Sequence, residues 1–257
     1  MPKRAPTSDA QISPACHVGL VFALGMEAGG LVDRMSGLVR ISGAGFIGRE
    51  GSVAGKHVVV FESGVGAAAA AHGARALIAG HKPRWVISAG FAGGLDGKVK
   101  LGDIVLADHV VDEAGRRLDI ELAVDQAALA STRGLHVGGL VTVDHVVRTA
   151  EQKQQLGATT GALAVDMETI SVAEVCRDER VRFLAVRGIT DAVDRNLPRD
   201  IEYLLRRKTT AGRLGAAARA LVRRPASIKD LWQLKEDALK VSERLGQFLV
   251  GVIGQLP

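Results

Sequence analysis

The segment from Ala164 to Asp194 constrains the fold more than any other part of the chain. It places two carboxylates, Asp166 and Glu168, at the start of an amphipathic helical pattern, and the apolar strand pattern from Phe183 to Val186 then leads to a third carboxylate, Asp191. In open α/β sheets, ligands bind outside the carboxyl ends of the strands. The pattern therefore predicts that Glu168 and Asp191 face one ligand. The alternative is that Asp166 and Asp191 only cap the neighbouring helix and turn.

Two earlier apolar runs end in residues that suit the same site. The run from His17 to Leu24 is followed by Glu27, and the strand pattern from Val58 to Glu62 leads through Ser63-Gly64-Val65-Gly66 into an alanine-rich helix. We expect Glu27 to reach the site, although the helix dipole also favours an acid in a first turn. The glycine turn is typical of backbone N–H groups that approach a small ligand or anion.

The same glycine turn formally matches the dinucleotide-binding pattern G-x-G-x-x-A. That pattern requires an acid roughly twenty residues further on to hold the ribose. No Asp or Glu occurs between Ser63 and Leu95. The residues therefore disfavour an NAD-dependent enzyme, which stays open only as an alternative that cofactor titration would test.

Three further segments continue the strand pattern. Trp85 to Ser88 predicts a strand that runs into Ala89-Gly90-Phe91-Ala92-Gly93-Gly94-Leu95, and Gly102-Asp103-Ile104-Val105 leads into the next. His136 to Val143 predicts another, followed by Asp144-His145-Val146-Val147. Small residues at the end of a strand allow a ligand to approach the backbone closely.

In this order the motifs resemble those of the nucleoside phosphorylase and nucleosidase superfamily. The matching blocks are Ser63 to Gly66, Ala89 to Leu95 with Gly102 to Val105, Val165-Asp166-Met167-Glu168, and Arg187-Gly188-Ile189-Thr190-Asp191. The resemblance implies a single α/β domain with a central twisted mixed sheet, partly barrel-like and flanked by helices. We expect this domain at residues 17–257, after a flexible tail at residues 1–16, with a helical C-terminal extension at about 200–257.

The resemblance also implies an activity. It implies cleavage of the N-glycosidic bond of a purine nucleoside, in particular a 5′-substituted adenosine, with release of adenine by attack of water or phosphate at the ribose. Glu27 would activate the water, Asp191 would protonate the leaving purine, and Glu168 would bind the ribose hydroxyls. Substrate contacts are expected from Ser63, Gly64, Gly90, Phe91, Val146, Asp166, Met167, Glu168 and Thr190. No cofactor is expected, and phosphate is an alternative co-substrate.

Two departures from the family pattern leave the reaction open. Phe91 stands where many members carry Ser or Thr, and a phenyl ring cannot hydrogen-bond a phosphate or a water. Val146 stands about where the family places a Phe that stacks on the purine. Glu27 favours hydrolysis over phosphorolysis, and a non-catalytic nucleoside-binding module is a further alternative.

The composition of the chain indicates where the protein is located and what it binds. Cys16 and Cys176 are the two cysteines, which suits a reducing compartment. The first residues lack the apolar core of a signal peptide, and no apolar run is long enough to span a membrane, so we expect a cytoplasmic protein. Metal-ligand spacings such as C-x-x-C or H-E-x-x-H do not occur, and no metal is expected. The resembled family usually assembles, which implies a homo-oligomer.

The basic residues are concentrated near the C-terminus. Between Arg195 and Arg224 stand nine Lys or Arg against two acids. Aromatic residues do not interleave with this charge, so nucleic acid is not expected. The cluster is either a solvated or subunit-facing surface, or a peripheral membrane contact. Together with the short segment from Asp108 to Leu122, it resembles members associated with hopanoid biosynthesis, which implies an adenosine with a long apolar 5′ group, such as adenosylhopane, as an alternative substrate.

Overall fold

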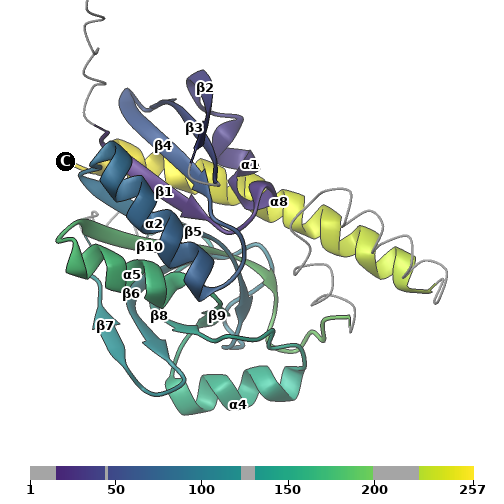
Figure 1. Cartoon of the computed structure of the whole chain (residues 1–257). Coiled ribbons are helices and arrows are strands. Elements are labelled where there is room, and N and C mark those ends of the chain that lie inside the picture. The colour runs from purple at the N-terminus through teal and green to yellow at the C-terminus, as the bar shows by residue number, and fades with distance from the viewer. Residues whose placement is uncertain (1–15, 44–45, 123–130, 199–225) are drawn as a thin grey trace, which may run out of the picture.

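The computed structural model describes residues 16–43, 46–122, 131–198 and 226–257. The strands are β1 (Val18–Phe22), β2 (Ser36–Gly43), β3 (Phe46–Val53), β4 (Lys56–Glu62), β5 (Trp85–Gly94), β6 (Ile104–Asp112), β7 (Arg117–Asp119), β8 (Leu135–Thr142), β9 (Ala164–Asp166) and β10 (Arg182–Asp191). The helices are α1 (Gly25–Val32), α2 (Ala67–His81), α4 (Ala150–Thr160), α5 (Thr169–Asp178) and α8 (Ala226–Gln255). The described strands belong to one mixed sheet (Figure 1).

Part of this sheet closes on itself. β5 pairs in parallel with β10, β10 pairs antiparallel with β6, and β6 pairs in parallel with β8. β8 then pairs in parallel with β9, which pairs antiparallel with β5 and completes the ring. From β5 the sheet continues as an open layer through β1, β4, β3 and β2. This confirms the expected α/β domain with a partly barrel-like mixed sheet.

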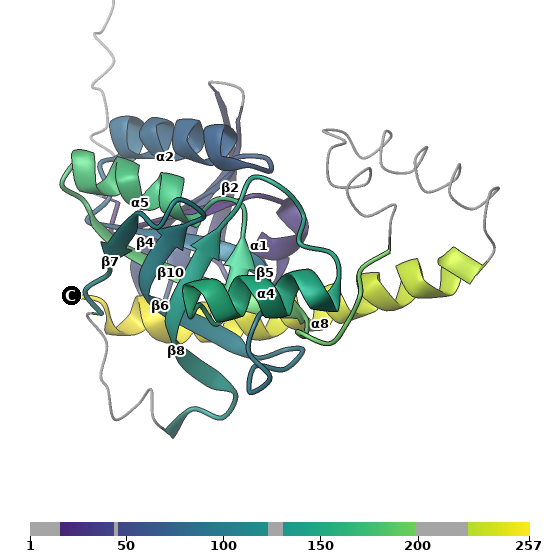
Figure 2. The ribbon, with the colours of Figure 1, turned by 90° about the horizontal axis from the view of Figure 1, so that it is seen from below.

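Helices cover both faces of the open layer. α2 and α5 pack together on one face, whereas α1 and α8 pack together on the other (Figure 2). Buried side chains such as Leu77 and Val172 fill the space beneath the first pair, and Leu245 and Leu249 fill it beneath α8. Burial of such apolar surface stabilises the fold by roughly 25 cal/mol per Å². The helix α8 is therefore an integral part of the core.

Four strands run parallel and end at the same edge of the sheet. These are β1, β4, β5 and β10, whose register places Phe22 beside Glu62 and Ile189 beside Ala92. The strand predicted to begin at Trp85 does not stop at Ser88 but continues to Gly94. Its small residues stay paired because β10 runs beside them as far as Asp191. The edge at which these strands end carries the predicted acids.

Some expectations fall outside the described residues. Residues 1–15 of the predicted tail are among them, whereas Cys16, its last residue, is buried in the core. Most of the basic cluster that ends at Arg224 and the part of the predicted extension before Ala226 also lie outside. Of the extension, α8 is described. Over the ranges that the structure covers, no helix is long and apolar enough to cross a membrane.

Candidate active site

A cavity of about 340 Å³ lies at the carboxyl ends of the parallel strands. Its walls are largely apolar, with Ala23, Val65 and Val143 among them. The predicted site residues that line it are Glu27, Phe91, Val146, Asp166, Met167, Glu168, Thr190 and Asp191. The fold thus brings together residues that lie more than 160 positions apart in the chain.

An adjoining cavity of about 10 Å³ shares Glu27, Phe91 and Glu168 with the larger one. Ser63, Ser88, Gly90 and Arg187 also line it. A space of this size holds about one water molecule. Gly64 lines neither of these two cavities, and its N–H donates to the carbonyl of Ala23 at 3.1 Å.

Another cavity, of about 420 Å³, lies at the opposite ends of β5 and β10, beside Trp85 and Arg182. Although it is larger, none of the predicted site residues lines it. Ligands of open α/β sheets bind at the carboxyl ends of strands, so we place the candidate site in the cavity of about 340 Å³.

Glu27 is buried in the first turn of α1, directly after β1. Its Oε2 accepts a hydrogen bond from the N–H of Leu24 at 2.7 Å, and its Oε1 accepts one from the N–H of Phe91 at 2.9 Å. A Cβ at Gly90 would lie 2.9 Å from Oε1, so the glycine makes room for this carboxylate rather than for a ligand. Burial raises the pKa of Glu27, against the lowering effect of these N–H donors and of Arg187.

Glu168 extends from the junction of β9 and α5 toward the glycine turn. Its Oε1 accepts a hydrogen bond from the N–H of Gly66 at 2.8 Å. The turn therefore presents an N–H group, as its sequence predicts, but this N–H binds the carboxyl group of Glu168. Burial, together with the nearby charges of Asp166 and Glu27, raises the pKa of Glu168 to about 8, against the lowering effect of the Gly66 N–H and of Arg187. This pKa favours a protonated Glu168 near neutral pH.

Asp166 points into the protein and is fully engaged. Its Oδ2 accepts hydrogen bonds from Arg187 Nε and Nη2, at 2.9 and 2.6 Å, and from the N–H of Thr169 at 3.1 Å. Its Oδ1 accepts one from Thr142 Oγ1 at 2.7 Å. Asp166 therefore caps the first turn of α5, which is the alternative role that its sequence position suggests. Its side chain holds its neighbours in place and has little capacity left for a ligand.

Arg187 has no role assigned by the sequence analysis, yet it is central to the site. Its Nη2 also donates to Ser88 Oγ at 2.8 Å and to Thr169 Oγ1 at 2.6 Å. The signal for it in the sequence is a charged residue inside an otherwise buried apolar strand, β10. Buried charges are retained where they are paired and hydrogen-bonded, as this one is with Asp166.

Asp191 is buried at the end of β10 and has an unforeseen cationic partner. Lys153, from α4, forms an ion pair with its Oδ2. Thr190 Oγ1 donates to its Oδ1 at 3.0 Å. The Nζ of Lys153 also donates to the carbonyls of Ala192, at 3.0 Å, and Arg195, at 2.7 Å. No periodic signal marks Lys153, because α4 is polar and otherwise largely exposed.

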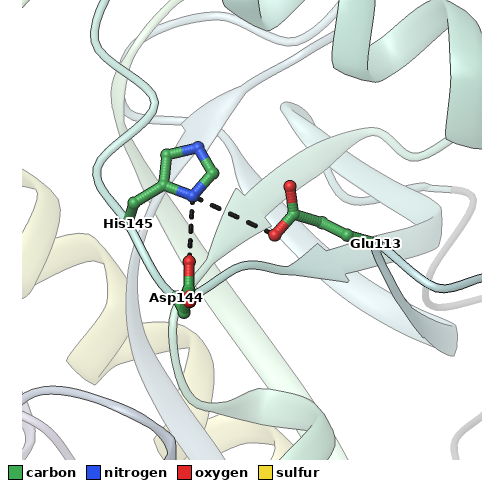
Figure 3. Close-up of side chains that lie close together, drawn as sticks. All are labelled: Glu113, Asp144 and His145. Atoms are coloured by element: carbon green, nitrogen blue, oxygen red, sulfur yellow. Dashed lines mark hydrogen bonds and ion pairs between the residues drawn. The ribbon is translucent and has the colours of Figure 1, made fainter.

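The loop after β8 forms another part of the cavity wall. Val146 and His145 line the cavity, and the ring of His145 lies beside Asp144, with Nδ1 3.1 Å from Oδ1, and beside Glu113, with Nδ1 4.0 Å from Oε2 (Figure 3). These three side chains lie close enough to hold a metal ion, but all are exposed, and exposed acidic groups are common without one. Val146 offers an aliphatic contact where an aromatic ring would stack.

The helix α8 completes the cavity. Leu234 and Ala238 of α8 line it together with Leu197 and Met26, so this side of the wall is mainly apolar. Lys235 lies among them. The described part of the C-terminal extension, which the sequence predicts to be helical, therefore contributes directly to the cavity wall.

Comparison with known proteins places this geometry in context. A family model described as the phosphorylase superfamily matches residues 17–223. The 5′-methylthioadenosine/S-adenosylhomocysteine nucleosidase from Neisseria meningitidis, in complex with methylthio-immucillin-A, superposes with a TM-score of 0.73 at 21% identity, covering 93% of this chain and 99% of that one. The Helicobacter pylori nucleosidase superposes with a TM-score of 0.73 at 19% identity, covering 94% of this chain and 99% of that one. The S. pneumoniae nucleosidase superposes with a TM-score of 0.71 at 18% identity, covering 94% of this chain and 100% of that one. These likenesses show a common fold.

Proposed function

Because the chain belongs to the phosphorylase superfamily, we propose that it cleaves the N-glycosidic bond of a 5′-substituted adenosine and releases adenine. The observation that carries this proposal is the convergence of Glu27, Glu168 and Asp191 on one cavity. The similar structures from Neisseria meningitidis and Helicobacter pylori are nucleosidases for 5′-methylthioadenosine and S-adenosylhomocysteine, which supports the choice of substrate class.

Each carboxyl group suits one part of this chemistry. Cleavage builds positive charge on the ribose and negative charge on the departing purine. Asp191 gives a proton to the purine, Glu27 takes one from the attacking water, and Glu168 binds the ribose hydroxyls. The raised pKa of Glu27 makes its carboxylate a stronger base than an ordinary glutamate. Met167, which lines the cavity beside Glu168, packs against the sugar.

The geometry supports water over phosphate as the nucleophile. The cavity of about 10 Å³ beside Glu27 has room for one water and is too small for a phosphate ion. Arg187 lines that cavity, but its guanidinium already donates hydrogen bonds to Asp166, Ser88 and Thr169. Phe91 supplies a backbone N–H to Glu27 in place of the side-chain hydroxyl that many family members carry.

A second candidate substrate rests on the apolar wall. Met26, Leu197, Leu234 and Ala238 form a surface that would contact an apolar group on the 5′ carbon. Val146 weakens enclosure of the purine, so a large apolar 5′ group would supply binding energy that base stacking does not. This supports the alternative that the chain acts on an adenosine with a long hydrocarbon 5′ group, such as adenosylhopane.

A substrate panel tests these statements. Adenine release is measured by chromatography from adenosine, 5′-methylthioadenosine and adenosines with 5′-alkylthio groups of increasing length, with and without phosphate. We expect release that needs no phosphate and a kcat/KM that rises with chain length. Release that requires phosphate would make the protein a phosphorylase. Tight binding without release from any member of the panel would leave a non-catalytic nucleoside-binding module.

A further inference from the structure

The side chain of Lys153 is completely buried although its helix is mostly exposed. An ammonium group has three N–H donors, and taking it out of water is costly unless these are satisfied. Lys153 donates to the carbonyls of Ala192 and Arg195, and its charge is paired with Asp191 Oδ2. Its position is therefore defined by Asp191 and by the turn that follows β10.

This arrangement has a direct connection to the cavity. Asp191 and Thr190 line the cavity, and Lys153 holds the carboxyl group from the side opposite to Thr190, which donates to Oδ1. The turn is held a second time by Arg195, whose Nη1 lies 3.0 Å from Asp237 Oδ2 on α8. Lys153 thus connects Asp191 to the turn that Arg195 joins to α8.

We propose that Lys153 is a positioning residue for catalysis, which fixes Asp191 and stabilises the carboxylate that remains once Asp191 has protonated the departing purine. This inference rests on the proposed function. A cation placed beside charge that develops during the reaction lowers the barrier, because it binds the transition state more strongly than the ground state.

Cleavage of the N-glycosidic bond needs no reactant other than the nucleoside and water. The bond between the ribose carbon and the purine nitrogen breaks, and its electron pair goes to the purine. Asp191 carries a proton when the nucleoside is bound, gives this proton to the purine, and becomes the carboxylate that is paired with the ammonium of Lys153. The oxygen of water bonds to the ribose carbon, and Glu27 receives the proton that the water loses. Lys153 keeps its three protons throughout.

Other charged groups share the cavity and bear on its pH dependence. The ionisable side chains that line it from α1, the β9–α5 junction, the loop after β8 and α8 are Glu27, Asp166, Glu168, His145 and Lys235. Asp166 is neutralised by Arg187. Lys153 is the cation paired with Asp191, so its removal is expected to change the proton affinity of that acid more than that of the others.

The test compares Lys153→Met, Asp191→Asn, the double variant and the control Lys240→Met, which removes an exposed lysine paired with Glu236. Adenine release from 5′-methylthioadenosine is followed across pH 5 to 10. We expect Lys153→Met to lower kcat by about 10- to 100-fold with a smaller change in KM. The basic limb of its rate profile should move to higher pH, because loss of the cation makes the proton on Asp191 harder to remove. Lys240→Met should match the wild type.

The double variant separates positioning from a merely structural role. Lys153→Met should reduce kcat by less than about 3-fold in the Asp191→Asn background, because its effect acts through that acid. An equal loss of kcat in both backgrounds, or a lowered melting temperature with an unmoved basic limb, would overturn the proposal. If Lys153→Met alone does not fold, the double variant, which removes both charges of the buried pair, is compared with Asp191→Asn, and a further loss of kcat above about 3-fold would overturn the proposal.

Adenine binding, measured by calorimetry, distinguishes a failure of the role given to Lys153 from a failure of the proposed function. Wild-type protein that releases no adenine from any substrate would refute the proposed function. In that event adenine should still bind, and Lys153→Met should weaken its binding in the wild-type background by at least 3-fold but not in the Asp191→Asn background. Adenine affinity that is unaffected by Lys153→Met, or the absence of adenine binding, would then contradict the role given to Lys153.

Discussion

Glu168 shows at the scale of one residue how burial changes the proton affinity of a carboxyl group in the site. Its pKa is raised from an ordinary value of 4.5 to about 8, mainly by burial. Between these values the folded chain binds a proton that the unfolded chain does not, and stability then falls as pH rises. The cost of the buried charge is therefore absent below about pH 4.5 and fully present above about pH 8.

Glu168→Gln should remove this dependence. We expect the variant to be more stable than the wild type at pH 9 by on the order of 2 to 5 kcal/mol, with little difference at pH 4. Urea denaturation at both pH values measures the two free energies of unfolding. Glu236→Gln on the exposed side of α8 serves as the control and should leave the difference between the two pH values intact. An unchanged pH slope in Glu168→Gln would contradict the assignment.

The contact between α1 and α8 carries a prediction at the scale of elements. The two helices cross so closely that a Cβ on Gly246 would lie 2.1 Å from the carbonyl carbon of Gly30. Because α1 carries Glu27 and α8 carries Leu234 and Ala238, this crossing sets two walls of the site relative to one another.

Gly246→Ala should therefore destabilise the protein by about 1 to 3 kcal/mol or more, as overpacking does. Gly251→Ala, on the same helix but with no atom within 4 Å of the added Cβ, should instead stabilise it by about 0.5 to 1 kcal/mol. Thermal denaturation of the two variants measures the contrast. Equal melting temperatures would show that α8 does not pack on α1 as described.

The sequence predicts much of the arrangement of this molecule because strand patterns are local and parallel strands share an edge. Glu27, Glu168 and Asp191 follow or end such patterns, so their convergence can be foreseen. The groups that pair with these acids cannot be foreseen from the sequence. Lys153 lies in a polar helix whose spacing says nothing about which side chain turns inward, and the N–H of Gly66 turns out to bind Glu168.

Closure of the sheet explains the remaining differences at the scale of the whole molecule. β5 is longer than its apolar run because β10 and β9 both pair with its glycine-rich end. Asp166 lies on β9 inside this ring, where Arg187 from β10 reaches it, and it therefore supports the site from within. Such long-range pairings depend on closure, which no local pattern of residues encodes.

The central claim is that the three converging carboxylates form a catalytic site that uses water. The most direct measurement is phosphate-free adenine release from 5′-methylthioadenosine by the wild type, Glu27→Gln and Asp191→Asn, with the folded state of each verified by thermal denaturation. We predict release by the wild type and a loss of kcat of about 10²- to 10⁴-fold in each variant. Folded variants that release adenine at the wild-type rate would contradict the claim.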